Sequence, residues 1–417
     1  MTRSQGEIEQ FDVAVIGGGP AGATAATELA KQGRRVWLLD RPGRIKPCGG
    51  AIPPRLIKDF EIPDHLIVAR ANCARVVAPS TAEVDMPIDG GYVGMVDREV
   101  FDEWLRERAE ATGATRAAGS FDHLEQDGEE VIVRFRSHGN DRSGPLSQIR
   151  ARVVIGADGA NSAVAKARVR GSEKGGFVAA YHEIVKAPAA DPDYDGSRCD
   201  IYYRGDLSPD FYSWIFPHGD VLSVGTGTAR KGFSIRQSVT DLRRLTGLQG
   251  ETVRREGAPI PLKPLPRWDD GKNVVLAGDA AGVVAPASGE GIYYAMVGGQ
   301  LAAEAAHSCL ATGNPKALRR ARRQFMRAHG RVFWILGIMQ RFWYTTDKRR
   351  ERFVTMCADP DVQYLTWQAY MHKELVRARP KAHVKIFFRD LGHLIGIGRT
   401  RDAEDKIEDR EARTAAG

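Results

Sequence analysis

The sequence predicts an α/β fold: a Rossmann-type nucleotide-binding domain that carries an inserted antiparallel β domain and is followed by a helical C-terminal region. Three observations predict it. Residues 11–40 contain a strand, a glycine-rich turn, a helix and a second strand. Two later apolar strands each end near a glycine–aspartate pair, and aromatic-rich β runs lie between them. Strands alternating with helices are typical of a parallel sheet, whereas strands that follow one another are typical of antiparallel sheets.

The first unit, residues 11–40, reads FDVAVIGGGPAGATAATELAKQGRRVWLLD. Its opening run, rich in Val and Ile, is typical of a buried parallel strand, and the Ala- and Leu-periodic segment after it predicts a helix. Gly17, Gly19 and Gly22 have the G-x-G-x-x-G spacing. The first glycine permits a tight turn, the second lets a pyrophosphate approach the backbone, and the third lets the helix lie close to the strand. The unit therefore predicts a dinucleotide-binding site.

Charged residues near this unit are candidate cofactor contacts. Asp40 ends the second strand, where a carboxylate accepts hydrogen bonds from a ribose, and Arg41 follows it. Arg98 begins an amphipathic helix predicted over residues 96–113 and is a candidate partner of a cofactor phosphate or ribose. The alternative for Arg98 is an exposed arginine at a helix start. The pattern alone does not choose between NAD and FAD.

Length and composition are those of a folded protein with two or three domains: 417 residues, 42% hydrophobic and 27% charged. The five cysteines are scattered without a C-x-x-C pair. This argues against a zinc site or a disulfide framework and favours a reducing compartment. Residues 1–10 are polar and no apolar run reaches eighteen residues, so we expect neither a signal peptide nor a membrane-spanning helix.

The net charge of +7 is concentrated in residues 316–352, which carry a local excess of +10. This basic segment surrounds the apolar run VFWILGIM at residues 332–339. Such a pattern predicts either an interfacial helix on anionic lipid or a solvated basic face beside an ordinary buried helix. Nucleic acid is not expected, because no binding motif accompanies the charge. The first alternative predicts a peripheral protein at the cytoplasmic face of the membrane.

Two later units extend the nucleotide-binding pattern. A buried strand leads into Asp158-Gly159 within VVIGADGANS, and another leads into Gly278-Asp279 within NVVLAGDAAG. Residues 289–291, Gly-Glu-Gly, then open a long helix of small residues. The three units in this order resemble the FAD-dependent oxidoreductases related to para-hydroxybenzoate hydroxylase.

This resemblance implies FAD as the cofactor. It implies that Asp279 binds the ribitol chain and that Asp158 lies between the flavin and a nicotinamide donor, with Gly159 and Gly278 in the same two motifs. Independently of the resemblance, the helix start at Gly289 and Gly291 supplies amides and a positive dipole end. These groups stabilise negative charge on the N1–C2=O edge of a reduced flavin.

The region between these two motifs has a different texture. Four β-rich runs with aromatic residues are predicted at residues 177–184, 198–204, 211–216 and 221–226. We expect an antiparallel substrate domain whose aromatic side chains form a wall for an apolar substrate: Tyr202, Tyr212, Trp214 and Phe216. The alternative is that these aromatics belong to the core, because strand register decides which of them face a cavity.

Three further stretches resemble geranylgeranyl reductases, and most closely the branch that serves (bacterio)chlorophyll synthesis in photosynthesis. They are KPCGGAIP at residues 46–53, YSWIFP at residues 212–217 and FVTMCADPDVQYLTWQAY at residues 353–370. The likeness covers residues 11 to about 399. It implies an oxidoreductase acting on CH–CH groups, which reduces isolated double bonds of a geranylgeranyl chain to give phytyl, on the pigment ester or on the free diphosphate. It also implies a hydride that passes from NADPH through FAD.

Reduction of an isolated alkene needs a proton as well as a hydride, because no carbonyl polarises the double bond. Cys48 is a candidate proton donor, since the loop after the second strand is expected to run toward the flavin; alternatively it only shapes the pocket. Glu290 is a second catalytic candidate that equally fits a cap on its own helix. No second G-x-G-x-x-G follows a strand. NADPH therefore binds without a Rossmann domain of its own, or another donor reduces the flavin.

Three other functions compete with this reading. A flavin monooxygenase or halogenase would share the scaffold, although only one tryptophan stands in the WIFP run and CGGAIP is foreign to that group. A reductase of another polyprenyl lipid and a non-enzymatic electron carrier are the others. The expected division is an FAD-binding domain of residues 11–75, 96–175 and 270–312, a substrate domain of residues 76–95 and 176–269, and a helical region of residues 313–398, with residues 1–10 and 399–417 disordered.

Overall fold

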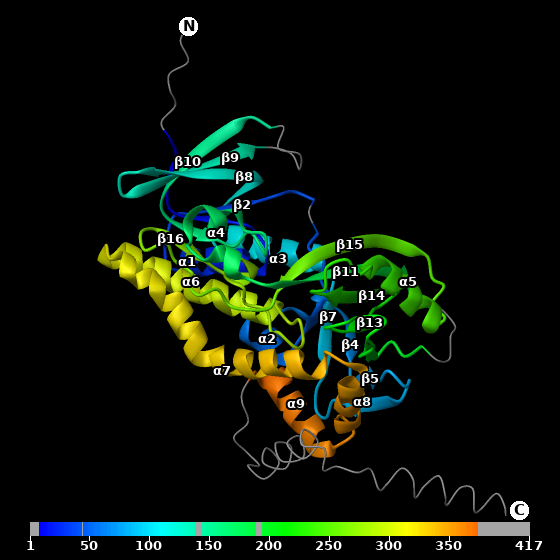
Figure 1. The fold of residues 1–417 in the computed structure, drawn as a ribbon. Coiled ribbons are helices and arrows are strands. Elements are labelled where there is room, and N and C mark those ends of the chain that lie inside the picture. The colour runs from blue at the N-terminus through cyan, green and yellow to red at the C-terminus, as the bar shows by residue number, and fades with distance from the viewer. Residues whose placement is uncertain (1–7, 44, 138–143, 189–193, 374–417) are drawn as a thin grey trace, which may run out of the picture. The chain divides into compact units, whose positions relative to one another are not determined.

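A computed structural model describes residues 8–43, 45–137, 144–188 and 194–373 (Figure 1). The chain divides into two compact units, the first ending at Cys357 and the second beginning at Ala358. Each unit is considered by itself below. The disorder expected for residues 399–417, and for all but the last three of residues 1–10, concerns positions outside the described residues. The domain bounds expected from the sequence stay a prediction.

The first sheet gathers the strands of the nucleotide-binding pattern. Its members are β1 (Gln10–Ile16), β2 (Val36–Asp40), β8 (Thr115–Asp127), β9 (Glu130–Ser137), β10 (Leu146–Gly156) and β16 (Val274–Leu276). β1 pairs in parallel with β2 and with β10, and β10 pairs in parallel with β16. The long antiparallel strands β8 and β9 extend the sheet. The three predicted motifs therefore leave neighbouring parallel strands at their carboxyl ends, where open α/β sheets bind ligands.

Helices cover this sheet. They are α1 (Pro20–Lys31), α3 (Arg98–Ala111), the short α4 (Ala163–Arg168) and α6 (Ile292–Thr312). The predicted amphipathic helix is confirmed as α3, which is capped by Asp97 and buries Phe101, Leu105 and Ala109. α1 and α6 pack against each other at Gly299, where a Cβ would stand 2.2 Å from the carbonyl oxygen of Ala21. Small residues thus let the two helices approach closely.

The second sheet has seven strands in the order β15 (Thr252–Pro261), β11 (Phe177–Lys186), β14 (Val221–Thr228), β13 (Ser213–His218), β12 (Arg198–Tyr202), β5 (Cys73–Val77) and β6 (Glu83–Pro87). All its pairs are antiparallel except β12–β5. Helix α5 (Ile235–Leu245), which the sequence analysis did not identify, packs on one face against β11 and β14 (Figure 1). The predicted β-rich insertion is therefore one continuous sheet.

Smaller elements join the two sheets. β3 (Ala51–Ile52), β7 (Val93–Val96) and β4 (Ile67–Ala71) form a three-stranded antiparallel sheet, and α2 (Pro54–Asp59) follows β3. Single turns of 3₁₀ helix occur at Asp64–Leu66, Ser172–Lys174, Gly278–Ala281 and Pro315–Leu318.

The described part of the C-terminal region, residues 313–373, is helical, as predicted. α7 (Arg319–Trp343) packs on α6, α8 (Asp347–Met356) follows it, and α9 (Pro360–His372) belongs to the second unit. Among the described residues, no helix is both long enough and apolar enough to span a bilayer.

Arg350 on α8 is buried although it belongs to the basic segment, so that segment is not uniformly a solvated face. Arg350 is 2% exposed, and its guanidinium donates to the backbone carbonyls of Ser208, Pro209 and Tyr344. Arg350→Met should lower the free energy of unfolding by about 3 kcal/mol, because buried carbonyls lose their donor. Urea denaturation measures this loss. Arg331→Met, on the exposed face of α7, should change stability by less than about 0.5 kcal/mol, and an equal loss in both variants would contradict the assignment.

Candidate functional site

The glycine-rich turn after β1 has the geometry that a dinucleotide needs. Gly17 has φ +102°, and a Cβ there would stand 2.4 Å from the carbonyl oxygen of Ala157. A Cβ on Gly22 would stand 1.8 Å from the carbonyl oxygen of Gly17. Beside Gly19, by contrast, no atom lies within 4 Å of that position. The turn is closed where helix meets strand and open at Gly19, which fits the approach of a pyrophosphate.

Asp40 lies next to this turn and has a partner that the sequence analysis missed. Arg106 of α3 donates from Nη1 to Oδ2 of Asp40 at 3.0 Å and to the carbonyl oxygen of Gly18 at 3.3 Å. Burial raises the pKa of the Asp40 carboxyl, and Arg106 opposes the shift. Arg106 lies eight residues after Arg98 on the same helix. This spacing, two steps of four residues, was the signal in the sequence that could have marked Arg106 as a second cofactor-side arginine. Arg41 is exposed.

The Asp-Gly motif meets the glycine-rich turn, because the Cα of Asp158 is 3.0 Å from the Cβ position of Gly17. The Asp158 carboxylate accepts from Oγ of Ser162 at 2.5 Å and from the backbone amide of Ala163 at 2.7 Å. Burial raises the pKa of Asp158, and these hydrogen bonds oppose the shift. Gly159 follows with φ +86° and no atom within 4 Å of its Cβ position. Asp158 thus holds the loop that begins α4 against the glycine-rich turn.

The Gly-Asp motif is joined to the KPCGGAIP loop by an ion pair. Nζ of Lys46 donates to Oδ2 of Asp279 at 2.5 Å, and the Asp279 side chain is 8% exposed. The other carboxylate oxygen of Asp279 lies 3.8 Å from the Cβ position of Gly291 at the start of α6. The structure therefore brings residues 278–279 and 289–291 of the predicted site together with Lys46. Lys46 itself was not predicted, since nothing local marks a pairing across 233 residues.

Cys48 in the same loop lies beside a buried ion pair of α3. Arg98 donates from Nε and Nη2 to both oxygens of Asp102, at 2.8 and 2.6 Å, and the two side chains are 4% and 8% exposed. The amide of Gly50 donates to Sγ of Cys48 at 3.4 Å, and the Cys48 thiol interacts electrostatically with the Arg98 guanidinium. Burial lowers the pKa of Arg98, but Asp102 and Cys48 outweigh it and the pKa is raised. The Cys48 sulfur thus accepts one backbone N–H and interacts with a buried guanidinium.

Trp214 and Phe216 of the predicted substrate wall face this loop. A Cβ on Gly49 would stand 3.1 Å from Cδ2 of Phe216 and 3.9 Å from Nε1 of Trp214. The two rings lie 6.2 Å apart between centroids. These two aromatic side chains therefore stand against the residue next to Cys48.

Tyr212 continues the wall toward the start of α6. Its ring packs edge-on to Trp214 at 6.0 Å and stacks on Phe211 at 4.2 Å. Its hydroxyl donates to the carbonyl oxygen of Ser288 at 2.5 Å, one residue before Gly289. Burial raises the pKa of Tyr212, and the Tyr344 hydroxyl and the Cys48 thiol add to the rise. Phe211, which stacks on Tyr212, belongs to the same aromatic cluster.

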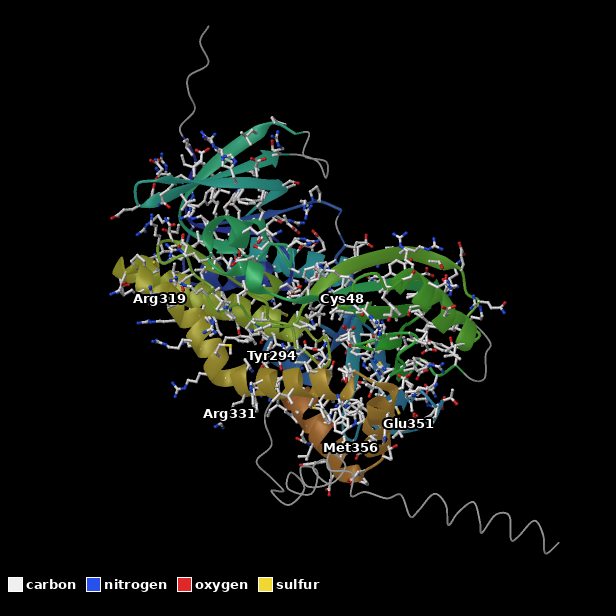
Figure 2. The ribbon with its side chains drawn as sticks, in the orientation of Figure 1. Cys48, Tyr294, Arg319, Arg331, Glu351 and Met356 are labelled. Atoms are coloured by element: carbon white, nitrogen blue, oxygen red, sulfur yellow. The ribbon has the colours of Figure 1, made fainter. Side chains whose placement is uncertain are left out.

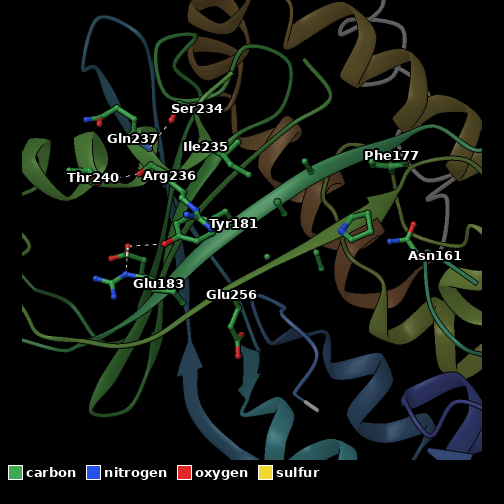
Figure 3. A pocket seen from close by; sticks show the side chains of 16 residues that line it. Asn161, Phe177, Tyr181, Glu183, Ser234, Ile235, Arg236, Gln237, Thr240 and Glu256 are labelled. Carbon is green, nitrogen blue, oxygen red and sulfur yellow. Dashed lines mark hydrogen bonds and ion pairs between the residues drawn. The ribbon is translucent and has the colours of Figure 1, made fainter. Parts of the chain in front are cut away.

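Tyr202 lies apart from the other three aromatics. It pairs with Ser213 across β12 and β13, and it packs with Ile215, Val239 and Leu242 on the face that α5 covers. A cavity of about 930 Å³ opens beside α5, between Asn161, Tyr181, Arg236 and Glu256 (Figure 3). Its lining includes Tyr181 of the α5-side cluster and also Glu256, which pairs with His182 on the other face of the sheet.

Glu290 is buried and caps its own helix. Its Oε1 accepts from the backbone amide of Tyr293 at 2.9 Å, in the first turn of α6. This contact is the capping alternative considered above; a catalytic role for Glu290 stays a prediction.

Taken together, the residues fit FAD. The open side of the turn at Gly19 follows β1, the carboxylate of Asp40 ends β2, and Asp279, which pairs with Lys46, follows β16. We expect these three groups to contact the phosphate, the ribose and the ribitol of FAD, respectively. Asp279 contacts Lys46 of the Cys48 loop and lies beside the start of α6. An isoalloxazine bound here would have the backbone amides of α6 on one side and Cys48 on the other. The chain would hold the cofactor with these groups.

Comparison with known proteins agrees with this geometry. The family described as FAD binding domain matches residues 10–48 and 61–202. Geranylgeranyl diphosphate reductase of Rhodobacter capsulatus is 53% identical over 93% of this chain and 98% of the relative. The Synechocystis protein of that name is 37% identical over 92% and 97%. A geranylgeranyl bacteriochlorophyll reductase-like structure from Thermoplasma acidophilum superposes with a TM-score of 0.77 at 20% identity, covering 90% of this chain and 100% of that one. The chain belongs to the geranylgeranyl diphosphate reductase family, built on an FAD binding domain.

Proposed function

We propose that the protein reduces isolated double bonds of a geranylgeranyl group to give phytyl, with FAD bound and NADPH as the donor. The substrate is geranylgeranyl diphosphate or the geranylgeranyl ester of a (bacterio)chlorophyll. The observation that carries the proposal is the aromatic wall against the Cys48 loop: Trp214 and Phe216 at Gly49, and Tyr212 beside Gly289. Apolar rings at the point where the cofactor motifs converge suit a polyprenyl chain and no polar substrate. The names of the relatives support the same substrate.

A bound FAD supplies the hydride transfer, and the residues of this chain supply the rest. Each reduction adds one hydride and one proton across C=C. We assign the proton to Sγ of Cys48, which lies in the loop that Trp214 and Phe216 contact and accepts from the amide of Gly50 at 3.4 Å. The faces of Trp214 and Phe216 stabilise cationic character on the neighbouring carbon. The same rings keep water from trapping it.

An anaerobic product assay tests the proposal. The purified protein with FAD and NADPH is given geranylgeranyl diphosphate and geranylgeranyl-bacteriochlorophyll in separate tubes, and the prenyl chain is followed by mass spectrometry. Stepwise gains of two hydrogens are expected, and the faster tube names the preferred substrate. No gain in either tube, with oxygen restoring NADPH consumption and adding an oxygen atom, would favour the monooxygenase alternative.

The same proposal extends to a membrane surface as the place where the substrate is met. Helix α7 buries one stripe, Phe325, His329 and Phe333. Its opposite face carries the exposed residues Arg319, Arg320, Arg323, Arg327, Arg331, Trp334, Ile335, Ile338 and Arg341. Trp334 is 69% exposed. Figure 2 shows Arg319 and Arg331 pointing away from the neighbouring helices.

This exposed face has the chemistry of an interfacial helix. Positions 327, 331, 334 and 338 are three or four residues apart and therefore share one side of the helix. Arginines bind anionic headgroups there, while Trp334 and Ile338 enter the boundary below them. The apolar run of the basic segment is thus divided, with Phe333 in the core and Trp334 outside.

Arg327→Gln combined with Arg331→Gln should weaken binding to vesicles that contain anionic lipid about 30-fold, since each basic side chain contributes about 1 kcal/mol. The difference should shrink as salt rises. Co-sedimentation with phosphatidylglycerol-containing vesicles measures it. The control pair, Arg230→Gln with Arg236→Gln, removes the same charge from exposed positions near α5 and should bind like the parent. Equal binding by all three proteins would leave α7 as an ordinary solvated face.

A further inference from the structure

A row of polar side chains crosses four strands of the seven-stranded sheet behind the aromatic wall. Glu256 on β15 stands opposite His182 on β11, and His182 stands opposite Gly225 on β14. Gly225 stands opposite Trp214 on β13. Because paired positions share a face of a sheet, the row ends at the indole that forms the wall. Neither the sequence motifs nor the proposed chemistry uses His182, Glu256 or Ser223, the other member of the row.

The members of the row are joined by hydrogen bonds of ordinary length. Nε1 of Trp214 donates to Oγ of Ser223 at 3.1 Å, and Oγ of Ser223 is 2.9 Å from Nδ1 of His182. Nε2 of His182 is 2.9 Å from Oε2 of Glu256. Arg254 pairs with the other carboxylate oxygen of Glu256 at 2.6 Å. His182 and Ser223 are buried, at 3% and 0% exposure.

Gly225 gives the row its shape. A Cβ there would stand 2.3 Å from Cζ2 of Trp214 and 2.7 Å from Cβ of His182. The absence of a side chain at this position lets the indole and the imidazole lie over the central strand, with ring centroids 6.5 Å apart. Burying polar groups costs desolvation that their hydrogen bonds must offset, whereas apolar residues would fill this face of the sheet without that cost.

We propose that Ser223, His182 and Glu256 are positioning residues that hold Trp214 in the orientation required for prenyl reduction, acting through the indole N–H. The inference rests on the proposed function. The carboxylate fixes the imidazole, the imidazole fixes the serine hydroxyl, and the hydroxyl oxygen accepts from the indole. A donated N–H also leaves more electron density on the indole face, which strengthens its attraction for a developing cation.

A double-mutant cycle with geranylgeranyl diphosphate tests the coupling. Ser223→Ala should lower kcat about five- to tenfold with little change in KM, and Glu256→Gln, farther along the row, about threefold. Trp214→Phe keeps an aromatic face but removes the N–H. In that background neither substitution should lower kcat further by more than twofold. FAD content and the urea midpoint of each variant serve as folding controls.

A measurement that needs no turnover accompanies the cycle. Near-UV circular dichroism of Trp214→Phe against the parent isolates the band of this indole, and the same band should weaken in Ser223→Ala and Glu256→Gln. Losses in kcat that are equal in the tryptophan and phenylalanine backgrounds, or an unaltered band, would overturn the proposal. A parent enzyme that reduces no alkene would instead refute the proposed function, and the band would still decide whether the row holds the indole.

Discussion

Cys48→Ala should retain FAD and slow alkene reduction about 1000-fold, within the range that general acids contribute. The thiol is the proton donor that the proposed mechanism assigns, in the loop that Trp214 and Phe216 contact, and the amide of Gly50 donates to its sulfur at 3.4 Å. Single-turnover oxidation of the reduced enzyme by geranylgeranyl diphosphate measures the step, and the flavin absorbance reports occupancy.

Controls separate this loss from a general effect of removing a thiol. Cys73→Ala, on β5 and half-buried, should react like the parent. Cys48→Ser replaces the thiol by a hydroxyl of similar size that is a much weaker acid. Alkene reduction by this variant should therefore be at least 100-fold slower than by the parent. Turnover by Cys48→Ala within twofold of the parent would remove Cys48 from the mechanism and leave it as a residue that shapes the pocket.

The arrangement around Cys48 also shows where sequence reasoning could not reach. The G-x-G-x-x-G spacing and the two glycine–aspartate motifs are local, and each is read from a strand and the turn that follows it. The partners Arg106–Asp40 and Lys46–Asp279 join positions 66 and 233 residues apart. Only the folded sheet brings such pairs together, so the cofactor motifs were predictable and the charges that hold them were not.

The aromatic wall depends on register, which the sequence leaves open. Trp214 and Phe216 are two residues apart in β13 and therefore lie on the same face. Tyr202 lies on the other face, toward α5, because it pairs with Ser213. A shift of one residue in this pairing would exchange the two faces. The row at His182 has the same origin, since three strand pairings align four residues that the chain separates. Their alignment becomes visible only in the sheet.

The largest effect on the cofactor is expected from Asp279→Ala, which should weaken FAD binding about 100-fold, so that the protein is purified largely without flavin. A charged hydrogen bond to the cofactor is worth about 3 kcal/mol, and its loss also leaves Lys46 without the carboxylate that it contacts. Lys46→Met should weaken FAD binding less, because the carboxylate of Asp279 that we expect to bind the ribitol is retained. Asp241→Ala, an aspartate on α5 remote from the motifs, is the matched control. Flavin titration of each apoprotein gives the dissociation constants, and urea midpoints verify folding. If Asp279→Ala binds FAD as tightly as the parent, the carboxylate serves only to anchor Lys46 and its loop.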